Sequence, residues 1–169
     1  MKMPMLLYLE YKKSNIIRGG LIYSIGDTIA ALMLDEFSLA RLLIMILVGS
    51  TIYAFEIPNY FRWIDQKTAS YSGLKKSLSR TALALMYFNP LWIARHLFFI
   101  KIALLPWQEI VFTELLSIAF YSFLVNIPVA FLANFLIQNK VNLRWRFLAS
   151  AIFSALMAIY YAMSTVWFS

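Results

Sequence analysis

Five ionisable side chains inside otherwise apolar stretches of the sequence are candidates for chemistry. They are Asp27, Glu56, Arg95, His96 and Glu114. An ionisable side chain at the centre of a bilayer costs at least ~2.5 kcal/mol on insertion scales, so such groups pair with one another, lie near the interface or face a water-filled cavity. The chemistry open to these residue types is therefore charge pairing and the binding of a polar solute in apolar surroundings.

Long apolar segments surround these residues. The chain has 169 residues, of which 62% are hydrophobic and 14% charged, whereas a soluble domain is roughly 45–50% apolar and about 25% charged. About 20 apolar residues suffice to cross the hydrocarbon core. We predict an all-α polytopic membrane bundle, one domain over residues 1–169, with transmembrane segments at 19–34, 40–57, 81–105, 110–137 and 147–168.

The basic residues predict an orientation for these segments. Twelve of the fifteen Lys and Arg residues precede the first segment or fall in the second–third (59–80) and fourth–fifth connections. The positive-inside rule therefore predicts an N-terminus on the cytoplasmic or matrix-equivalent side and a C-terminus outside. The apolar run near the start is too short for a signal-peptide core, so we expect no cleaved presequence.

Depth in the membrane suggests which polar groups meet. Asp27 would lie near the midplane and Arg95 nearer the outer side, which predicts an ion pair that gates or lines a path. Glu114 would lie near the outer surface and Glu56 toward the inner side. The predicted pathway residues are Asp27, Arg95, Glu56, Glu114, Asn126 and Asn134. The alternative is that these residues make satisfied helix-to-helix contacts that only fix the fold, and His96 by itself is better explained as a packing or interfacial residue.

The last apolar segment carries a row of small residues. Ser150, Ser154, Ala158 and Ala162 recur every four residues and form one narrow face of a helix. Small residues allow helices in a membrane to approach closely. We interpret this row as a helix-packing face; the alternative is a face that mediates dimerisation.

Several kinds of chemistry are poorly supported. The chain has no cysteine and one histidine, so no thiolate or second imidazole can complete a transition-metal site. It lacks the GxSxG, GxxxxGK and HExxH motifs. We expect no catalytic residues, no metal and no cofactor. The net charge of +7 comes from residues between apolar runs, which favours anionic lipid head groups over nucleic acid as partners.

Short motifs follow one another along the chain: Gly26-Asp27-Thr28-Ile29-Ala30, Arg41, Gly49, Tyr60-Phe61, Ile64-Asp65 and Leu74-Lys75-Lys76. Later, Pro128 is followed by Asn134-Phe135, then by Arg144 and a last apolar segment. In these residues the chain resembles the small peroxisomal and mitochondrial inner-membrane channel family of the Mpv type, although Ile127 and Phe131 replace that family's usual Trp and Gln. The resemblance implies a small bundle that moves or gates small solutes without a bound cofactor.

A second set of motifs gives a competing resemblance. Arg80-Thr81, Pro90-Leu91-Trp92 and Trp107-Gln108 are similar to the second half of the bacterial L-alanine exporter family. That family is four helices long, so the segment at 147–168 would be additional. This resemblance also implies that a small solute is moved across a membrane, but the solute would differ from that of the Mpv-type family.

These observations predict a small channel or transporter-like membrane protein for small solutes, with assembly into a homo-oligomer left open. The main alternative is a structural or adaptor membrane protein without flux, whose basic inner loops bind lipid head groups or a partner through Lys75, Lys76 and Arg80. An intramembrane enzyme acting on a lipid is a third hypothesis.

Overall fold

The computed structural model describes the backbone of residues 9–167 and the side chains of residues 9–160, and the described chain is almost entirely helical. No strand occurs in this part of the chain, so the predicted all-α bundle is confirmed. The helices are α1 (Lys13–Met33), α2 (Leu39–Val48), a π-helical turn (Gly49–Tyr53), α3 (Ala54–Lys67), α4 (Gly73–Tyr87), α5 (Pro90–Leu104), a 3₁₀ turn (Trp107–Glu109), α6 (Phe112–Lys140) and α7 (Leu143–Trp167).

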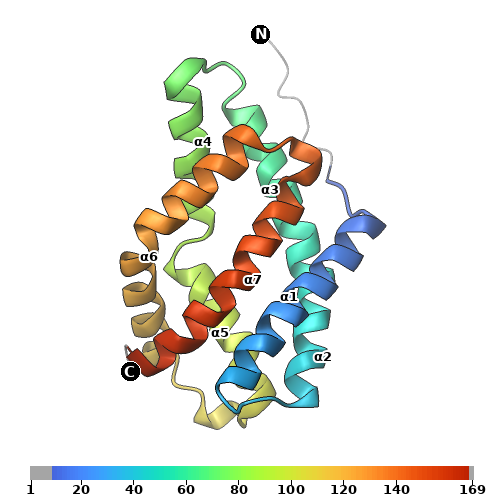
Figure 1. Cartoon of the computed structure of the whole chain (residues 1–169), viewed down its shortest axis with the longest axis vertical. Helices are drawn as coiled ribbons and strands as arrows, with labels where there is room; N and C mark the ends of the chain where they lie inside the picture. The colour runs from blue at the N-terminus through green and yellow to red at the C-terminus, as the bar shows by residue number, and fades with distance from the viewer. Residues whose placement is uncertain (1–8, 168–169) are drawn as a thin grey trace.

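The described chain passes along the bundle five times (Figure 1). The second passage joins α2, the π-helical turn and α3, and the third joins α4 and α5. Each passage is long and apolar enough to cross a membrane, with a mean hydropathy between 1.2 and 2.0. Helix α1 packs against α7, while α6 packs against α4, α5 and α7. This is the architecture of a multi-pass membrane protein.

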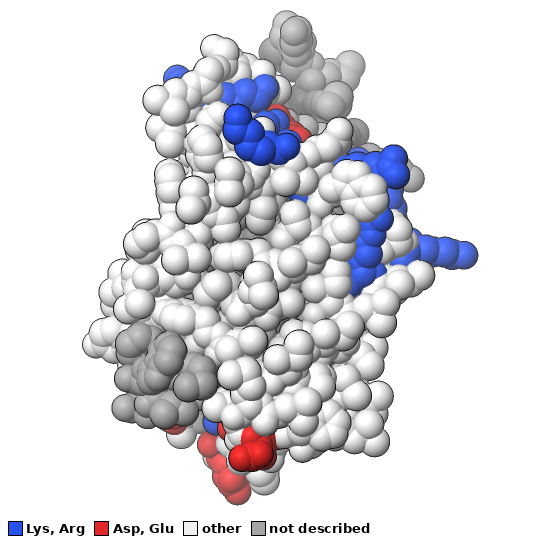
Figure 2. Space-filling model, viewed as in Figure 1, with Lys and Arg blue, Asp and Glu red and all other residues white. Residues whose placement is uncertain are grey.

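Charge is distributed unequally between the two ends of the bundle. In the view of Figure 2, Lys and Arg side chains gather toward the end that holds the α3–α4 and α6–α7 connections, and acidic side chains gather at the opposite end. We call these the basic end and the acidic end. The acidic end holds the α1–α2 connection with Asp35 and Glu36 and the α5–α6 connection with Glu109.

The predicted connection at 59–80 is wrong, because α3 continues to Lys67 and α4 begins at Gly73. Hydropathy detects only the part of a helix that lies in hydrocarbon, and the helices here continue beyond it. The polar turns are joined by Asp65, whose carboxylate forms ion pairs with both Arg80 and Arg146. For the same reason α1 begins at Lys13 and not at residue 19.

The third passage is interrupted just before Pro90. Helix α4 ends at Tyr87, and α5 starts afresh at Pro90. The Asn89 side chain accepts a hydrogen bond from the backbone N–H of Trp92 over 3.1 Å. An Asn cap followed by proline at the first helical position is a favourable helix start, so two short helices replace one bent helix.

Two glycines bring α1 into backbone contact with the second passage. A Cβ atom added at Gly19 would lie 2.1 Å from the carbonyl oxygen of Gly49, and one added at Gly49 would lie 2.5 Å from that of Gly19. Beside this crossing, the fully buried ring of Tyr53 packs against Tyr23 and Trp92, with centroid separations of 4.7 and 5.3 Å. The core of the bundle is built around this crossing.

The small residues of α7 lie against α1. Ser150 and Ala158 are buried and Ser154 is half-buried, whereas the side chain of Ala162 lies outside the described residues. A Cβ atom added at Gly26 of α1 would lie 2.5 Å from the Cβ atom of Ala155. The two helices therefore approach as closely as small side chains permit.

Candidate functional site

Asp27 is paired with Arg41 and not with Arg95, so the predicted Asp27–Arg95 ion pair is wrong. Arg41 donates from Nε and Nη2 to the two carboxylate oxygens of Asp27, each over 2.8 Å. Both side chains are 2% exposed. Arg41 also donates from Nη1 to Glu36 over 2.8 Å. The sequence places Arg41 close to a predicted connection, whereas in the structure Ser38 caps α2 and Arg41 stands in its first turn, facing α1.

Arg95 takes part in a second ion pair. Its Nη2 atom lies 2.8 Å and its Nη1 atom 3.2 Å from the carboxylate oxygens of Glu56. The Tyr87 hydroxyl donates to the same carboxylate over 2.8 Å. Glu114 is exposed in the first turn of α6 and forms no ion pair within the described residues. The four predicted charged pathway residues are therefore not brought together on one path.

His96 belongs to the aromatic core. Its ring is stacked on Trp92 with an interplanar angle of 2°, and its Nδ1 atom lies 3.0 Å from the hydroxyl of Tyr53. The side chain is 3% exposed. These contacts are those of a packed core histidine with a satisfied ring nitrogen.

A row of polar residues runs along α6. Ser122, Asn126, Asn134 and Gln138 lie at multiples of four residues, and all are buried. Residues four apart form a ridge on a helix, and sixteen residues span ~24 Å at 1.5 Å per residue, which is most of the hydrocarbon thickness. Asn126 and Asn134 were predicted from the sequence. Ser122 and Gln138 were missed, although their four-residue spacing in an apolar helix is a signal that could have found them.

Several polar atoms on and beside this row have no hydrogen-bond partner among the described residues. They are Oγ of Ser122, both amide atoms of Gln138, and the indole Nε1 of Trp92. Leaving such a buried group unpaired costs about 1–3 kcal/mol, and a bilayer offers no water to compensate. Buried polar atoms without a protein partner are often explained by water or a ligand.

The middle of this row faces a small hollow of about 20 Å³ between α5, α6 and α7, which we call the mid-bundle cavity. Its polar lining comes from Asn126, Asn134, Ser150 and Ser154, and Trp92 forms part of its wall. The Tyr23 hydroxyl lies 3.5 Å from the hydroxyl of Ser154. A volume of this size holds about one water molecule. The cavity can therefore accept a polar group halfway along the bundle.

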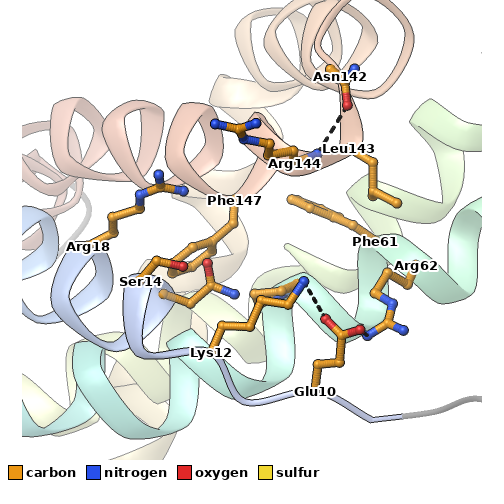
Figure 3. Close-up of a pocket in the computed structure, with 12 residues that line it drawn as sticks. Glu10, Lys12, Ser14, Arg18, Phe61, Arg62, Asn142, Leu143, Arg144 and Phe147 are labelled. Carbon is orange, nitrogen blue, oxygen red and sulfur yellow. Dashed lines mark hydrogen bonds and ion pairs between the residues drawn. The ribbon is translucent and has the colours of Figure 1, made fainter.

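A much larger hollow opens at the basic end (Figure 3). It has a volume of about 690 Å³, and we call it the basic pocket. It is lined by Glu10, Lys12, Ser14, Asn15, Arg18, Pro58, Phe61, Arg62, Asn142, Leu143, Arg144 and Phe147. The pocket is not apparent in the sequence, because its walls come from the segment before α1 and the start of that helix, from α3 and from the start of α7.

The two hollows come close to each other along α7. Phe147 lines the basic pocket, and Ser150, three residues further, lines the mid-bundle cavity. Three residues of helix rise by ~4.5 Å. The Phe147 side chain is 3% exposed, so about one helical turn of packed apolar side chains separates the cavity from the pocket.

Among the described residues that line the basic pocket, Glu10 is the one carboxylate. It pairs with Lys12 over 2.6 Å and with Arg62 over 3.2 Å. The hydrogen bond from Lys12, together with the charge of Arg62, holds the pKa of Glu10 below its ordinary value of 4.5. Glu10 is therefore ionised at neutral pH and partly offsets the surrounding positive charge.

The described residues hold no group of three or more His, Cys, Asp or Glu side chains that could bind a metal ion. Comparison of the chain with protein-family models, with curated proteins and with solved structures finds no match.

Proposed function

We propose that this protein is a channel or transporter-like protein that moves small polar solutes across a membrane, with the mid-bundle cavity as its solute-binding point. One observation carries the proposal: two amides and two hydroxyls, from Asn126, Asn134, Ser150 and Ser154, line a hollow midway along an otherwise apolar bundle. A polar hollow at membrane depth is a costly feature that marks solute sites in transporters.

The basic pocket forms the inner vestibule of the proposed path. The positive-inside rule assigns the basic end to the inner side. A solute that enters there first meets Phe61 and Phe147. When the Phe147 ring moves aside, the solute passes from the basic pocket into the mid-bundle cavity, about one helical turn further along α7. In this proposal the described structure is a closed state, with Phe147 as the inner gate.

The opposite half of the bundle is closed by charge pairing. Asp27, Arg41 and Glu36 form a chain of ion pairs that begins at the acidic end, where Glu36 is 41% exposed, and continues inward to the buried Asp27. This arrangement supports a role for Asp27 in holding α1 and α2 together at the outer side and not in lining the path.

The lining indicates the chemical class of the solute. The side chains that face the mid-bundle cavity carry no formal charge, and amide and hydroxyl groups both donate and accept hydrogen bonds. A solute with a net charge would lie there without a counter-ion, which is costly at membrane depth. The proposed solute is therefore small, polar and without net charge.

The resemblance to the Mpv-type channel family remains part of this proposal. The fifth passage, α7, is additional to the four helices of the L-alanine exporter family, and α7 supplies Ser150 and Ser154 to the cavity. The presence of this helix supports the Mpv-type resemblance over the exporter resemblance.

A swelling assay in liposomes tests the proposal with several probe solutes in parallel. Purified protein is reconstituted, and stopped-flow light scattering follows uptake of glycerol, glycine and L-alanine. Wild-type protein is expected to raise the uptake rate of at least one probe above that of empty liposomes. Asn126→Leu is expected to abolish this increase, because it replaces the amide with an apolar group of similar size.

Ser117→Ala is the matched control, because Ser117 lies on the same helix but is exposed. This variant is expected to retain wild-type uptake. If wild-type protein that is helical by circular dichroism gives no uptake of any probe, the proposal is wrong and the adaptor hypothesis is favoured. Equal uptake by wild type and Asn126→Leu would remove the mid-bundle cavity from the path.

A further inference from the structure

The basic pocket contains more positive charge than its own carboxylate neutralises. The described residues of its lining include Lys12, Arg18, Arg62 and Arg144 but one carboxylate, that of Glu10. Glu10 is shared between Lys12 and Arg62. Arg18 and Arg144 form no ion pair within the described residues. The pocket is therefore short of negative charge, and the shortage is greatest beside these two arginines.

Trp145 brings the two unpaired arginines together. The guanidinium carbon of Arg18, from α1, lies 4.7 Å from the centre of the Trp145 ring, and that of Arg144 lies 4.9 Å from it. The two guanidinium carbons therefore lie within about 10 Å of each other, and an anion close to both would offset their mutual repulsion. Guanidinium groups bind phosphate oxygens through paired hydrogen bonds. The arrangement thus fits a phosphate group at the rim of the pocket.

The rest of the pocket is apolar. Pro58, Phe61, Leu143 and Phe147 contribute to its walls, and Figure 3 shows the two phenylalanine rings between the arginines of α1 and α7 on one side and Arg62 on the other. A ligand that fills this space carries apolar groups as well as an anion. A free inorganic phosphate would contact the arginines at the rim but would leave the apolar walls uncovered.

The position of the pocket identifies the source of such a ligand. Helix α1 begins at Lys13 and α7 at Leu143, so the pocket lies where the apolar parts of the passages begin. Trp145 and Leu143 beside it are each 40% exposed, and tryptophan is enriched at the level of lipid head groups. Phosphate with attached acyl chains is abundant at this depth.

We propose that the basic pocket binds an anionic phospholipid, with Arg18 and Arg144 on its phosphate and Phe61 and Phe147 against its glycerol and upper acyl groups. The lipid occupies the pocket through which the solute is proposed to enter, so it closes the inner vestibule while it is bound, and its binding is measured without a flux assay. It also differs from the head-group site predicted at Lys75, Lys76 and Arg80, since Arg80 is paired with Asp65 and Lys75 lies over the ring of Tyr71.

The test uses the purified full chain in a neutral detergent. Binding of dioctanoyl phosphatidylglycerol is measured by native mass spectrometry and by the shift in Tm, with dioctanoyl phosphatidylcholine as the zwitterionic probe. We expect phosphatidylglycerol to bind at least tenfold more tightly. Replacing both Arg18 and Arg144 with Gln is expected to remove this preference, whereas the double variant Lys75→Gln, Lys76→Gln retains it while losing the same charge.

Three results would overturn the proposal. One is equal affinity for the two lipids. Another is an equal loss in both double variants, which would mean that net charge and not the pocket decides binding. The third is displacement of phosphatidylglycerol by equimolar inorganic phosphate or glycerol phosphate, which would make the ligand a soluble phosphate.

A second variant covers the case in which the double arginine variant does not fold. Ser14 lines the pocket but is exposed, so Ser14→Glu is expected to fold and to place a carboxylate beside the phosphate site. It should weaken phosphatidylglycerol binding at least fivefold, and Ser14→Gln should not. An unchanged affinity in Ser14→Glu would also overturn the proposal.

Discussion

The guanidinium of Arg41 and the carboxylate of Asp27 form a two-point ion pair inside the bundle, with both hydrogen bonds 2.8 Å long. The pair connects α1 to the first turn of α2 at a place where each side chain is 2% exposed. Because each partner is nearly inaccessible, neither can turn to water if the other is lost. The pair is therefore expected to be a requirement of the fold.

Replacing Asp27 with Asn is expected to destabilise the protein by about 3–5 kcal/mol, because it leaves the charge of Arg41 buried without its partner. Unfolding in detergent with increasing SDS, followed by circular dichroism, measures the change. Glu36→Gln is the control, since Glu36 is 41% exposed and an exposed pair contributes about 0–1 kcal/mol. If Asp27→Asn lost solute flux but kept wild-type stability, Asp27 would be a residue of the solute path and not a structural partner of Arg41.

Glu56→Gln is expected to destabilise the protein by about 1–3 kcal/mol. It removes the carboxylate that pairs with Arg95, and the exposed parts of the two side chains, 36% and 34%, face lipid and not water inside a membrane-spanning passage, so Arg95 is left without a counter-ion. The same SDS titration measures it. In the proposed path Glu56 does not line the cavity, so flux should persist. A loss of flux with intact folding would show that the Glu56–Arg95 pair participates in transport.

Gly49→Ala is expected to destabilise the bundle by at least about 1–3 kcal/mol, the usual range for overpacking. Its Cβ atom would lie 2.5 Å from the carbonyl oxygen of Gly19, and backbone cannot move aside as a side chain does. Gly20→Ala is the control, because its nearest neighbour would be the Cβ atom of Ser50 at 3.3 Å. Equal Tm values for the two variants would argue against the close α1 crossing.

Gln138→Leu is expected to stabilise the protein by about 1–2 kcal/mol, because both atoms of the buried amide lack a partner among the described residues and the substitution removes that cost. The hydrogen bond from Arg80 to the Gln138 backbone carbonyl, 3.3 Å long, does not need the side chain. The Tm in detergent reports the effect. A lower Tm would mean that the amide is satisfied by water or a bound group in the functioning protein.

Glu10→Gln is expected to tighten phosphatidylglycerol binding several-fold at pH 7, because it removes the carboxylate from the basic pocket. In the wild type, the depressed pKa of Glu10 keeps the carboxylate ionised as the pH falls from 7 to 5. Its ion pairs stabilise the fold throughout this range and weaken only as the pH falls through the lowered pKa, below 4.5. Affinity measured by native mass spectrometry should not change between pH 7 and 5; a rise already at pH 6 would contradict this assignment.

The five passages and the charge difference between the two ends follow from the sequence by itself, because both depend on local composition. A long apolar segment must lie in the hydrocarbon whichever helices it packs against, and the basic residues fall in alternate connections between these segments. Asn126 and Asn134 were found for the same reason, since amides are conspicuous in an apolar segment. Ser122 was missed because serine is common in membrane helices, and Gln138 because it lies one residue beyond the predicted end at 137.

Tertiary structure decided which polar groups meet. Arg41 reaches Asp27 because the α1–α2 hairpin turns the first turn of α2 toward α1, and depth along the membrane contains no information on that rotation. The mid-bundle cavity needs α5, α6 and α7 together, and the basic pocket needs three segments that are distant from one another in the sequence. Composition determines that a segment crosses the membrane, but packing determines which face of it meets a neighbour, because that choice depends on side chains from helices distant in the sequence.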